Sequence, residues 1–598
     1  MPPDKIRINR THLKAKQMFS DKKNVNILTS LLVAHGVRHV VVCPGSRNAP
    51  LAHNFFVHPM LECHPVTDER SAGFYALGMA LSVNAPVAVC VTSGSALLNL
   101  APAVVEAAYQ HVPLVVVSAD RPPEWIGQLD GQTITQPGAL QTLVAKTVDL
   151  PARIDSEGEH WHCNRLVNEA LLAALYPVCS PVHINVPIDE PLFGFNTQQL
   201  PEERVVKYHP ASDMRNACMV ARWLLEAEHP MIVVGQYNHA IPENKCKTLG
   251  KAVAALASKV VVVAERLCQI PMDIVHIDEA LAIIGEDDEY LPDLIVYAGD
   301  TLVSKRLRHF LRKAKGARVV MLGRGSCLCD VTTHLTDVVE SAEIEDVILL
   351  AGTMADNGID MMTQESLEMP SGSHKAFHDK WQRVLDFAAK TAADYVPNFS
   401  QMAAVKYLEE QLDDMEYTFH VHYANSMAVR LANIYASHAV LCNRGVNGIE
   451  GSLSTAAGFS LATSDMVFCV IGDLSFFYDQ NALWNSSLRG NLRIVMLNNG
   501  GGGIFRQLSG LECSEARDTV VAASHNTEAQ GICTQNDIGY IKARGMEEVQ
   551  MGMVRLLTAA TKRPMLLEII TDPADDARAM QQYFKQLADL WQKENGKR

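Results

Sequence analysis

The sequence predicts an α/β protein made of three domains, each built on a doubly wound parallel β-sheet. Short apolar runs alternate with helix-length segments along the chain, and this alternation is typical of βαβ units. Glycine and polar residues follow many of these runs, at the strand ends where open α/β sheets bind ligands. The length of 598 residues is ample for several sizeable cores.

Changes in composition mark the domain boundaries. Residues 1–24 are basic and lack an apolar core, so we expect a mobile N-terminal arm there. The polar stretch 196–210 and the weakly hydrophobic stretch 356–373 separate the blocks of alternating strands and helices. The three predicted domains therefore cover residues 25–195, 210–355 and 374–598.

The composition excludes several classes of protein. A net charge of −15 argues against nonspecific nucleic-acid binding, which requires a basic surface. No run of about 18 uninterrupted apolar residues occurs, so we predict no membrane span. The 14 cysteines are scattered and include no CxxC pair, as expected for a reduced protein of the cytoplasm. An acidic chain of this kind can bind anionic substrates only through a local cluster of Arg and Lys.

The first predicted domain places polar residues at the ends of its strands. A helix over residues 25–36 precedes a strand over His39–Cys43, and further strands are predicted over Val87–Thr92, Leu114–Ala119 and Val182–Val186. Ser46 and Arg47 follow the first strand, and Arg121 follows the third. Asp68 and Glu69 precede a predicted helix over Ser71–Ser82, where a stabilising interaction with the helix dipole is the simplest explanation for two acidic residues.

The second predicted domain has a Rossmann-like pattern without a GxGxxG fingerprint. Its predicted strands cover Met231–Val234, Val260–Val263, Leu294–Ala298 and Val319–Leu322. Lys305 and Arg306 form its most conspicuous cationic pair. They could bind an anion, or they could belong to a solvated helix face together with Arg308 and Lys313.

The third predicted domain contains the most informative stretch. One apolar run, Met466–Ile471, ends at Gly472-Asp473, and a second, Ile494–Leu497, ends at two asparagines followed by four glycines. In a parallel βαβ unit these two ends lie at one edge of the sheet. Carboxylate, amide and glycine carbonyl oxygens are ligands suited to Mg²⁺. Further strands are predicted over Val440–Cys442 and Met565–Ile570.

This stretch resembles the diphosphate-binding signature of thiamine diphosphate enzymes. In that signature GDG is followed, some 25 residues later, by NN; here Gly472-Asp473-Leu474 is followed after 23 residues by Asn498-Asn499. Leu474 replaces the third glycine, and the spacing is slightly short. Neither change removes an oxygen ligand, so both are compatible with the cofactor.

Six motifs extend the resemblance to one family. PGSRNAPL, TDERSAGFYALGMA, VTSGSALLNLAPAVVEA, SADRPPE, CNRGVNGIEGSLSTAAG and GDLSFFYDQNAL are similar to those of the 2-succinyl-5-enolpyruvyl-6-hydroxy-3-cyclohexene-1-carboxylate (SEPHCHC) synthase family of menaquinone biosynthesis. The motifs lie in the first and third domains, while Ser304-Lys305-Arg306 carries the match in the second. The resemblance implies pyrimidine-binding, central and diphosphate-binding domains, in that order.

The resemblance also implies the reaction and the site. Members of the family are thiamine diphosphate-dependent transferases that decarboxylate 2-oxoglutarate and add the resulting succinyl carbanion equivalent to isochorismate, with release of CO₂. Glu69 is implied as the catalytic acid that hydrogen-bonds the cofactor's aminopyrimidine ring. The implied cofactor-binding residues are Glu69, Ser426, Ile449, Gly472, Asp473, Leu474, Ser475, Asn499 and Gly501, of which Asp473, Asn499 and Gly501 would bind Mg²⁺ or Mn²⁺. The implied substrate-binding residues are Ser46, Arg47, Arg121, Gln132, Lys305, Arg306, Ser426, Arg430, Arg444, Ile504, Phe505 and Leu508.

Some expectations stay open. Gln132 follows Gly131, where many family members have Asn. A homodimer or homotetramer with active sites at the subunit interface is implied by resemblance alone. An acetolactate synthase-like enzyme or another thiamine diphosphate-dependent decarboxylase or carboligase is an alternative, although neither a flavin-binding middle domain nor an acid/base His pair is evident. A noncatalytic protein that kept the fold is a further alternative, but Glu69 and Asp473 are both present.

Overall fold

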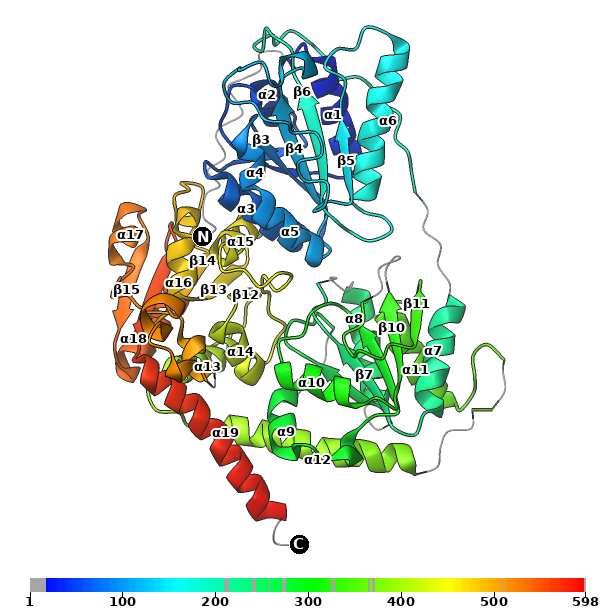
Figure 1. The fold of residues 1–598 in the computed structure, drawn as a ribbon, viewed down its shortest axis with the longest axis vertical. Helices are drawn as coiled ribbons and strands as arrows, with labels where there is room; N and C mark the ends of the chain where they lie inside the picture. The colour runs from blue at the N-terminus through cyan, green and yellow to red at the C-terminus, as the bar shows by residue number, and fades with distance from the viewer. Residues whose placement is uncertain are drawn as a thin grey trace. The chain divides into compact units, whose positions relative to one another are not determined.

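The computed structural model describes residues 18–208, 214–238, 243–256, 259–270, 276–323, 329–363, 366–367, 372–508 and 510–595. These residues form three parallel sheets with helices packed along them (Figure 1). The prediction of an α/β protein with three doubly wound parallel sheets is confirmed. The chain divides into two compact units: the first extends to Tyr208 except for Leu81–Asn84, and the second contains those four residues and the remainder.

The first unit is built on a six-stranded sheet of order β2-β1-β3-β4-β6-β5. The central strands β3 and β4 are buried along their whole length, as expected when helices cover both faces of a parallel sheet. The strands are β1 (His39–Val42), β2 (Glu62–Pro65), β3 (Val87–Val91), β4 (Leu114–Asp120), β5 (Lys146–Asp149) and β6 (Val182–Pro187). The helices are α1 (Lys23–Ala34), α2 (Ala49–Val57), α3 (Glu69–Val83), α4 (Ser95–Asn99), α5 (Ala101–Tyr109) and α6 (Glu157–Ala173).

The second unit contains the other two sheets, each of five strands. The second sheet has the order β11-β10-β9-β7-β8, and the helices α7 and α11 pack against each other beside it. Its strands are β7 (Pro230–Val234), β8 (Val261–Ala264), β9 (Leu294–Ala298), β10 (Arg318–Gly323) and β11 (Asp337–Glu340). The accompanying helices are α7 (Met214–Glu226), α8 (Glu243–Leu256), α9 (Ile277–Ile284), α10 (Lys305–Lys313), α11 (Ile344–Asn357) and α12 (Ser373–Asp394).

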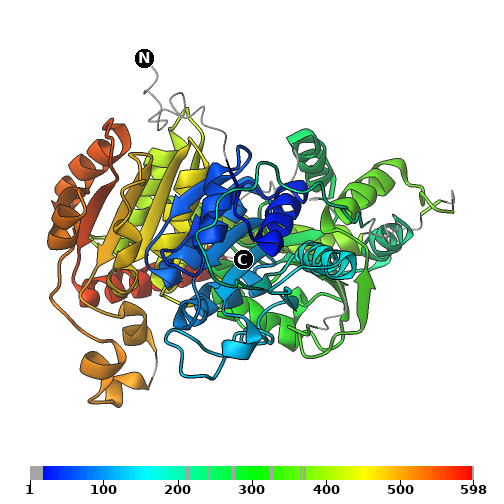
Figure 2. The ribbon, with the colours of Figure 1, turned by 90° about the horizontal axis from the view of Figure 1, so that it is seen from above.

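The third sheet has the order β12-β13-β14-β16-β15. Figure 2 shows its strands side by side in yellow to red, with α18 packed against β15 and β16. The strands are β12 (Phe419–Tyr423), β13 (Met466–Gly472), β14 (Leu492–Asn498), β15 (Gly539–Ala543) and β16 (Met565–Ile570). The helices are α13 (Gln401–Asp413), α14 (Met427–Tyr435), α15 (Ser452–Ala462), α16 (Asp473–Tyr478), α17 (Gln530–Gln535), α18 (Met546–Thr558) and α19 (Pro573–Asn595).

Two local predictions are wrong. Val440–Cys442 is not a strand of the sheet, because Leu441 forms only an isolated bridge with His422; Val440 and Cys442 are apolar because they are buried in the core of the third sheet. The prediction of a mobile N-terminal arm is wrong for residues 18–24, because Phe19 pairs with Thr197 and α1 begins at Lys23. The rest of the predicted arm, residues 1–17, lies outside the described residues.

Two further observations concern the chain as a whole. Among the described residues, no helix combines the length and apolarity needed to cross a membrane. The cysteines whose side chains are described are free thiols, and most of them are buried.

Candidate active site

The predicted residues of the first unit lie at the carboxyl edge of its sheet. Arg47 follows β1 and is buried; its Nη2 lies 3.0 Å from Oε1 of Glu190, and its Nη1 donates to the carbonyl of Ile188 at 3.1 Å. Ser46, next to it, is exposed. The guanidinium of Arg47 is therefore anchored on one side beside an exposed hydroxyl.

Glu69 occupies the first turn of α3. The predicted helix over Ser71–Ser82 thus begins two residues earlier than expected. Oε2 of Glu69 accepts a hydrogen bond from Nδ2 of Asn99, at the end of α4, with the two atoms 3.1 Å apart. The side chain is partly exposed, so a ligand can reach the carboxyl group. Asn99 was not predicted, because a single Asn at a helix end gives no functional signal.

Arg121 and Gln132 lie near each other in sequence and at the same edge. Nη2 of Arg121 donates to the carbonyl of Gly131 at 3.1 Å. Gln132 is exposed and has a positive φ of 61°. A Cβ atom on Gly94 would lie 3.1 Å from the Gln132 carbonyl oxygen, so a glycine at position 94 lets the Gln132 backbone approach.

In the second unit, Asp473 lies where β13 ends and α16 begins, and its carboxylate is buried. Oδ1 accepts from the backbone N–H of Leu474 at 2.7 Å, and Oδ2 accepts from that of Gly501 at 2.9 Å. Nε2 of His525 lies 3.4 Å from Oδ2. Burial raises the pKa of Asp473, and these N–H groups together with His525 oppose that shift. The ends of the paired strands β13 and β14 therefore meet, as the sequence predicts.

The loop after β14 requires glycine at two positions. Gly500 has a φ of 74° and Gly501 a φ of 154°, values that residues with a Cβ rarely adopt. A Cβ atom on Gly501 would lie only 2.8 Å from the carbonyl oxygen of Ala522. The Gly501 carbonyl itself accepts from the N–H of Gly503 at 3.0 Å.

Asn499 is held by a residue that the sequence did not point to. Its Nδ2 donates to Oδ2 of Asp576, in the first turns of α19, at 2.8 Å. Asp576 also accepts from the Thr571 hydroxyl and from the backbone N–H of Gln401, each at 2.8 Å. Burial raises the pKa of Asp576, and these hydrogen bonds lower it. Since Asp576 fixes which atom is the donor, Oδ1 is the atom of Asn499 that can act as a ligand.

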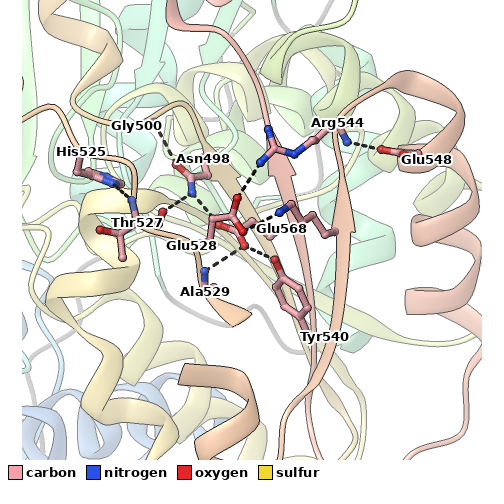
Figure 3. Close-up of polar contacts among 11 residues, drawn as sticks. Asn498, Gly500, His525, Thr527, Glu528, Ala529, Tyr540, Arg544, Glu548 and Glu568 are labelled. Atoms are coloured by element: carbon pink, nitrogen blue, oxygen red, sulfur yellow. Dashed lines mark hydrogen bonds and ion pairs between the residues drawn. The ribbon is translucent and has the colours of Figure 1, made fainter. Parts of the chain in front are cut away.

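A buried polar cluster supports the start of the same loop (Figure 3). Nδ2 of Asn498 donates to Oε1 of Glu568 at 2.7 Å, and its Oδ1 accepts from the N–H of Gly500 at 3.0 Å. Oε2 of Glu568 accepts from the Tyr540 hydroxyl at 2.6 Å and from the N–H of Ala529 at 3.0 Å. Glu568 therefore joins β14, β15 and the segment before α17 around the loop.

The oxygen atoms gathered here fit a hard divalent cation. Asp473 offers a carboxylate, Asn499 an amide oxygen and Gly501 a backbone carbonyl, all from two neighbouring strand ends. Mg²⁺ and Mn²⁺ prefer such ligands, and Mg²⁺ usually completes its shell with phosphate oxygens and water. Gly472 leaves the space next to its Cα open, which suits the approach of a large anionic group.

The remaining predicted cofactor contacts lie around the Gly-rich segment before α15. Ser426 precedes α14 with a φ of 73°. The Ser475 hydroxyl donates to the carbonyl of Ile449 at 2.8 Å. The Ile449 side chain is 39% exposed. An exposed isoleucine on an ordered turn can support the apolar part of a ligand.

Two arginines of the second unit, Arg430 and Arg444, concentrate positive charge. Arg444 is buried, and its Nη1 donates to Oδ1 of Asn425 at 3.1 Å. Arg430, on α14, donates to the carbonyl of Ser426 at 2.9 Å. Burial, and then the charge of Arg444, lower the pKa of Arg430. Two guanidinium groups that repel each other in a partly buried place favour binding of an anion.

A pocket of about 680 Å³ in the second unit brings together five predicted substrate residues. Its lining includes the side chains of Lys305, Arg306, Arg430, Ile504 and Leu508. These residues come from α10, α14 and the segment after β14. Phe505 does not line this pocket; its ring lies against Gly502, where a Cβ atom would be 2.6 Å from Cδ2 of the ring.

The pocket also has a wall that sequence reasoning missed. Asp278 forms an ion pair with Arg306 and accepts a hydrogen bond from the Ser304 hydroxyl. The Arg306 guanidinium lies 4.6 Å from the ring centroid of Phe584 on α19, a cation–π contact. Arg308 and Lys313, by contrast, donate to carbonyls of Leu302 and Glu286. An Asp in the first turn of a helix and a Phe on a C-terminal helix gave no local sign of a site.

The predicted residues thus fall into two groups. Those of the first unit lie along the carboxyl edge of one sheet, namely Ser46, Arg47, Glu69, Arg121 and Gln132. All the others lie in the second unit.

The chain is similar to known proteins along almost its whole length. The family described as thiamine pyrophosphate enzyme, N-terminal TPP binding domain, matches residues 23–144, and the corresponding C-terminal TPP binding domain matches residues 424–569. A Bacteroides thetaiotaomicron protein is 40% identical over 580 residues, which are 95% of this chain and 100% of that protein. A Porphyromonas gingivalis protein is 35% identical, covering 95% of this chain and 97% of that protein. Both carry the name 2-succinyl-5-enolpyruvyl-6-hydroxy-3-cyclohexene-1-carboxylate synthase.

Proposed function

Because the chain belongs to the 2-succinyl-5-enolpyruvyl-6-hydroxy-3-cyclohexene-1-carboxylate (SEPHCHC) synthase family, we propose that it is a thiamine diphosphate-dependent transferase of menaquinone biosynthesis. It decarboxylates 2-oxoglutarate, releases CO₂ and joins the remaining succinyl unit to isochorismate by conjugate addition, giving SEPHCHC. Pyruvate is not a substrate. The identity extends over both thiamine pyrophosphate-binding domains and the segment that joins them.

The observation that carries the substrate assignment is the cationic pocket of about 680 Å³. Both substrates carry carboxylates, and Arg pairs with carboxylates through two parallel hydrogen bonds. Lys305 and Arg306 lie in the first turn of α10, at the positive end of the helix dipole, where cations are unfavourable unless an anion is near. Asp278 neutralises part of that positive charge, and a substrate carboxylate would neutralise the remainder.

The apolar part of the pocket complements the substrates' carbon skeletons. Ile504, Leu508 and Phe584 all line it. In the first unit, Ser46, Arg47, Arg121 and Gln132 would bind the other substrate groups at the carboxyl edge. Ser426, Arg444 and Phe505 complete the proposed substrate contacts.

Two groups of residues would hold the cofactor, one at each of its ends. Bound thiamine diphosphate supplies the carbanion chemistry. Glu69 would donate a hydrogen bond to the pyrimidine ring nitrogen. Asp473, Asn499 and Gly501 would bind Mg²⁺ or Mn²⁺, whose charge would neutralise the diphosphate. The further cofactor contacts are assigned to Ser426, Ile449, Gly472, Leu474 and Ser475.

We assign the active enzyme to a homodimer or homotetramer of the cytoplasm, with its active sites at the subunit interface. The support is that Glu69 and Asp473 belong to different compact units, so two chains can each contribute one half of a site. Free, mostly buried thiols suit a reducing compartment.

The test is an assay of product formation with thiamine diphosphate and Mg²⁺, with either 2-oxoglutarate and isochorismate or pyruvate as the substrate. With 2-oxoglutarate and isochorismate, we expect CO₂ release and a product with the mass of SEPHCHC. Consumption of pyruvate with 2-oxoglutarate untouched would instead favour an acetolactate synthase-like enzyme. Tight cofactor binding without turnover of any 2-oxo acid would favour a noncatalytic protein.

A further inference from the structure

Three potential metal ligands meet at the opposite end of the first sheet from Arg47 and Glu69. Strands β1 and β2 pair in parallel, with His39 opposite Glu62 and Val41 opposite His64. Paired residues and their neighbours two positions along share one face of a sheet. His39, Glu62 and His64 therefore project to the same side, while Cys63 projects to the other.

The side chains bring their ligand atoms close together. Nδ1 of His39 lies 3.0 Å from Nε2 of His64 and 3.9 Å from Oε2 of Glu62. One ligand atom from each residue lies within 4.8 Å of the other two. His64 is buried and His39 partly buried, whereas the Glu62 side chain is 67% exposed. Two ligands are thus held by the sheet, and the third can adjust.

These distances suit a tetrahedral ion. Zn²⁺ binds nitrogen and oxygen ligands at roughly 2.0–2.1 Å, so two ligands of a tetrahedral site lie about 3.3 Å apart. The separations of 3.0 and 3.9 Å lie on either side of this value. Rotation of the exposed Glu62 carboxylate and a small shift of the His39 ring are sufficient to place the three atoms around one ion.

The two imidazoles can exchange the hydrogen bond between them for two bonds to a metal ion. In the neutral pair of imidazoles, one N–H hydrogen lies between Nδ1 of His39 and Nε2 of His64, which are 3.0 Å apart. When an ion binds, that proton moves through solvent to the other nitrogen of the same ring, so both facing nitrogens present lone pairs. Binding of the metal ion therefore releases no net proton from the two imidazoles.

The geometry points to a binding site for a borderline divalent transition-metal ion, of the Zn²⁺ class, formed by His39, His64 and Glu62. Two imidazoles and one carboxylate form a ligand set found at zinc sites that keep a fourth position for water. Mg²⁺ is disfavoured, because it prefers oxygen ligands. The site shares no residue with the proposed cofactor and substrate sites.

Binding would join two strands, of which one leads to a proposed substrate-binding residue and the other to the proposed catalytic acid. β2 is at the edge of the sheet and, among the described residues, pairs only with β1. The chain continues from β1 to Arg47 and from β2 to Glu69. A metal ion at the start of these strands therefore stabilises the first unit without touching the reacting groups, because anything that binds only the folded state increases stability.

The experiment uses the full chain after treatment with a chelator and dialysis, with saturating Mg²⁺ and thiamine diphosphate present. Zn²⁺ is titrated by calorimetry, and Co²⁺ is added separately because its visible absorption reports the number of ligands. The variants are Glu62→Ala and His39→Asn, with His162→Ala, an exposed histidine of the same unit, as the matched control. Glu62 is exposed, so its replacement leaves the fold intact.

We expect one Zn²⁺ ion per chain in wild type and His162→Ala, with an increase in the unfolding temperature of both. Loss of one ligand in Glu62→Ala should weaken binding by about tenfold or more, since even outer-shell changes cost this much. The Co²⁺ absorption should weaken in both ligand variants. Equal Zn²⁺ affinity in wild type, Glu62→Ala and His39→Asn would overturn the proposal.

Discussion

The side-chain amide of Asn499 donates a hydrogen bond to the carboxylate of Asp576, with Nδ2 and Oδ2 2.8 Å apart. This contact links the loop after β14 to α19, the last helix of the chain. It fixes the orientation of the amide, so that the oxygen of Asn499 is available to a cation. Asp576 is therefore expected to act as a positioning residue for metal binding.

Asp576→Asn should weaken binding of Mg²⁺ by roughly 10–100-fold, the usual cost of losing an outer-shell partner. The Mg²⁺ dependence of thiamine diphosphate binding, followed by calorimetry, measures the effect. Asp575→Asn is the matched control, because its carboxylate pairs with Arg578 on the exposed side of the same helix. An Asp576→Asn protein with the Mg²⁺ dependence of the control would contradict this role.

Phe584→Leu should raise the KM for the substrate whose carboxylate Arg306 binds, with a smaller change in kcat. Leucine keeps an apolar wall but removes the ring that lies over the guanidinium, a contact worth about 0.5–2 kcal/mol. That corresponds to a KM increase of roughly 2- to 30-fold. Leu590→Ala, on the same helix but outside the pocket lining, serves as the control. If both variants had the KM of wild type, Phe584 would not support substrate binding.

Mixing two inactive variants should restore activity. Glu69→Gln removes the proposed catalytic proton, and Asp473→Asn removes a proposed metal ligand. If each site takes Glu69 from one subunit and Asp473 from its partner, one site of every mixed dimer is intact. Random exchange of subunits then gives about a quarter of wild-type activity. No recovery after confirmed subunit exchange would show that one chain supplies both residues of a site.

Glu265 should make stability depend on pH. Burial raises the pKa of Glu265 to about 7, against the opposing N–H groups of Val303 and Ser304. A folded-state pKa above the ordinary value of 4.5 means that the folded state binds more protons. Its contribution to stability is therefore complete below about pH 4.5 and is lost as the pH rises through about 7.

The comparison is with Glu265→Gln, which cannot ionise. The free energy of unfolding of wild type, relative to this variant, should fall between pH 5 and pH 8 by at most about 1.4 kcal/mol per pH unit. Denaturant unfolding at several pH values gives the slope. Parallel stability profiles of the two proteins would mean that Glu265 has the same pKa in the folded and unfolded states.

The central strands were predictable because they are buried on both faces. β3, β4, β13 and β14 appear in the sequence as apolar runs with clear ends. The strands that sequence reasoning missed are β2, β5, β11, β12 and β15, and each lies at the edge of its sheet. These five strands include polar residues, as in the Glu-Cys-His-Pro segment of β2, whereas the edge strand β8 is an apolar run and was predicted.

The site was predictable where chemistry follows strand ends or family motifs. Asp473 and Asn499 follow directly from the βαβ rule, because parallel strands end at one edge. Lys305 and Arg430 meet in one pocket although 125 positions separate them in the chain, and resemblance rather than pattern predicted that. Asn99, Asp278, Asp576 and Phe584 were not predicted. Each contacts a residue that is distant in the sequence, and such contacts leave no local signal.

The most direct test of the proposed chemistry compares wild type with Glu69→Gln in a SEPHCHC assay, with cofactor binding measured in the same preparations. Glutamine keeps the size of the side chain but cannot supply the carboxyl proton. We predict that Glu69→Gln binds Mg²⁺ through Asp473 and Asn499 as wild type does, and forms product at least about a thousandfold more slowly. Product formation at the wild-type rate by Glu69→Gln would contradict the assignment of Glu69 as the catalytic acid.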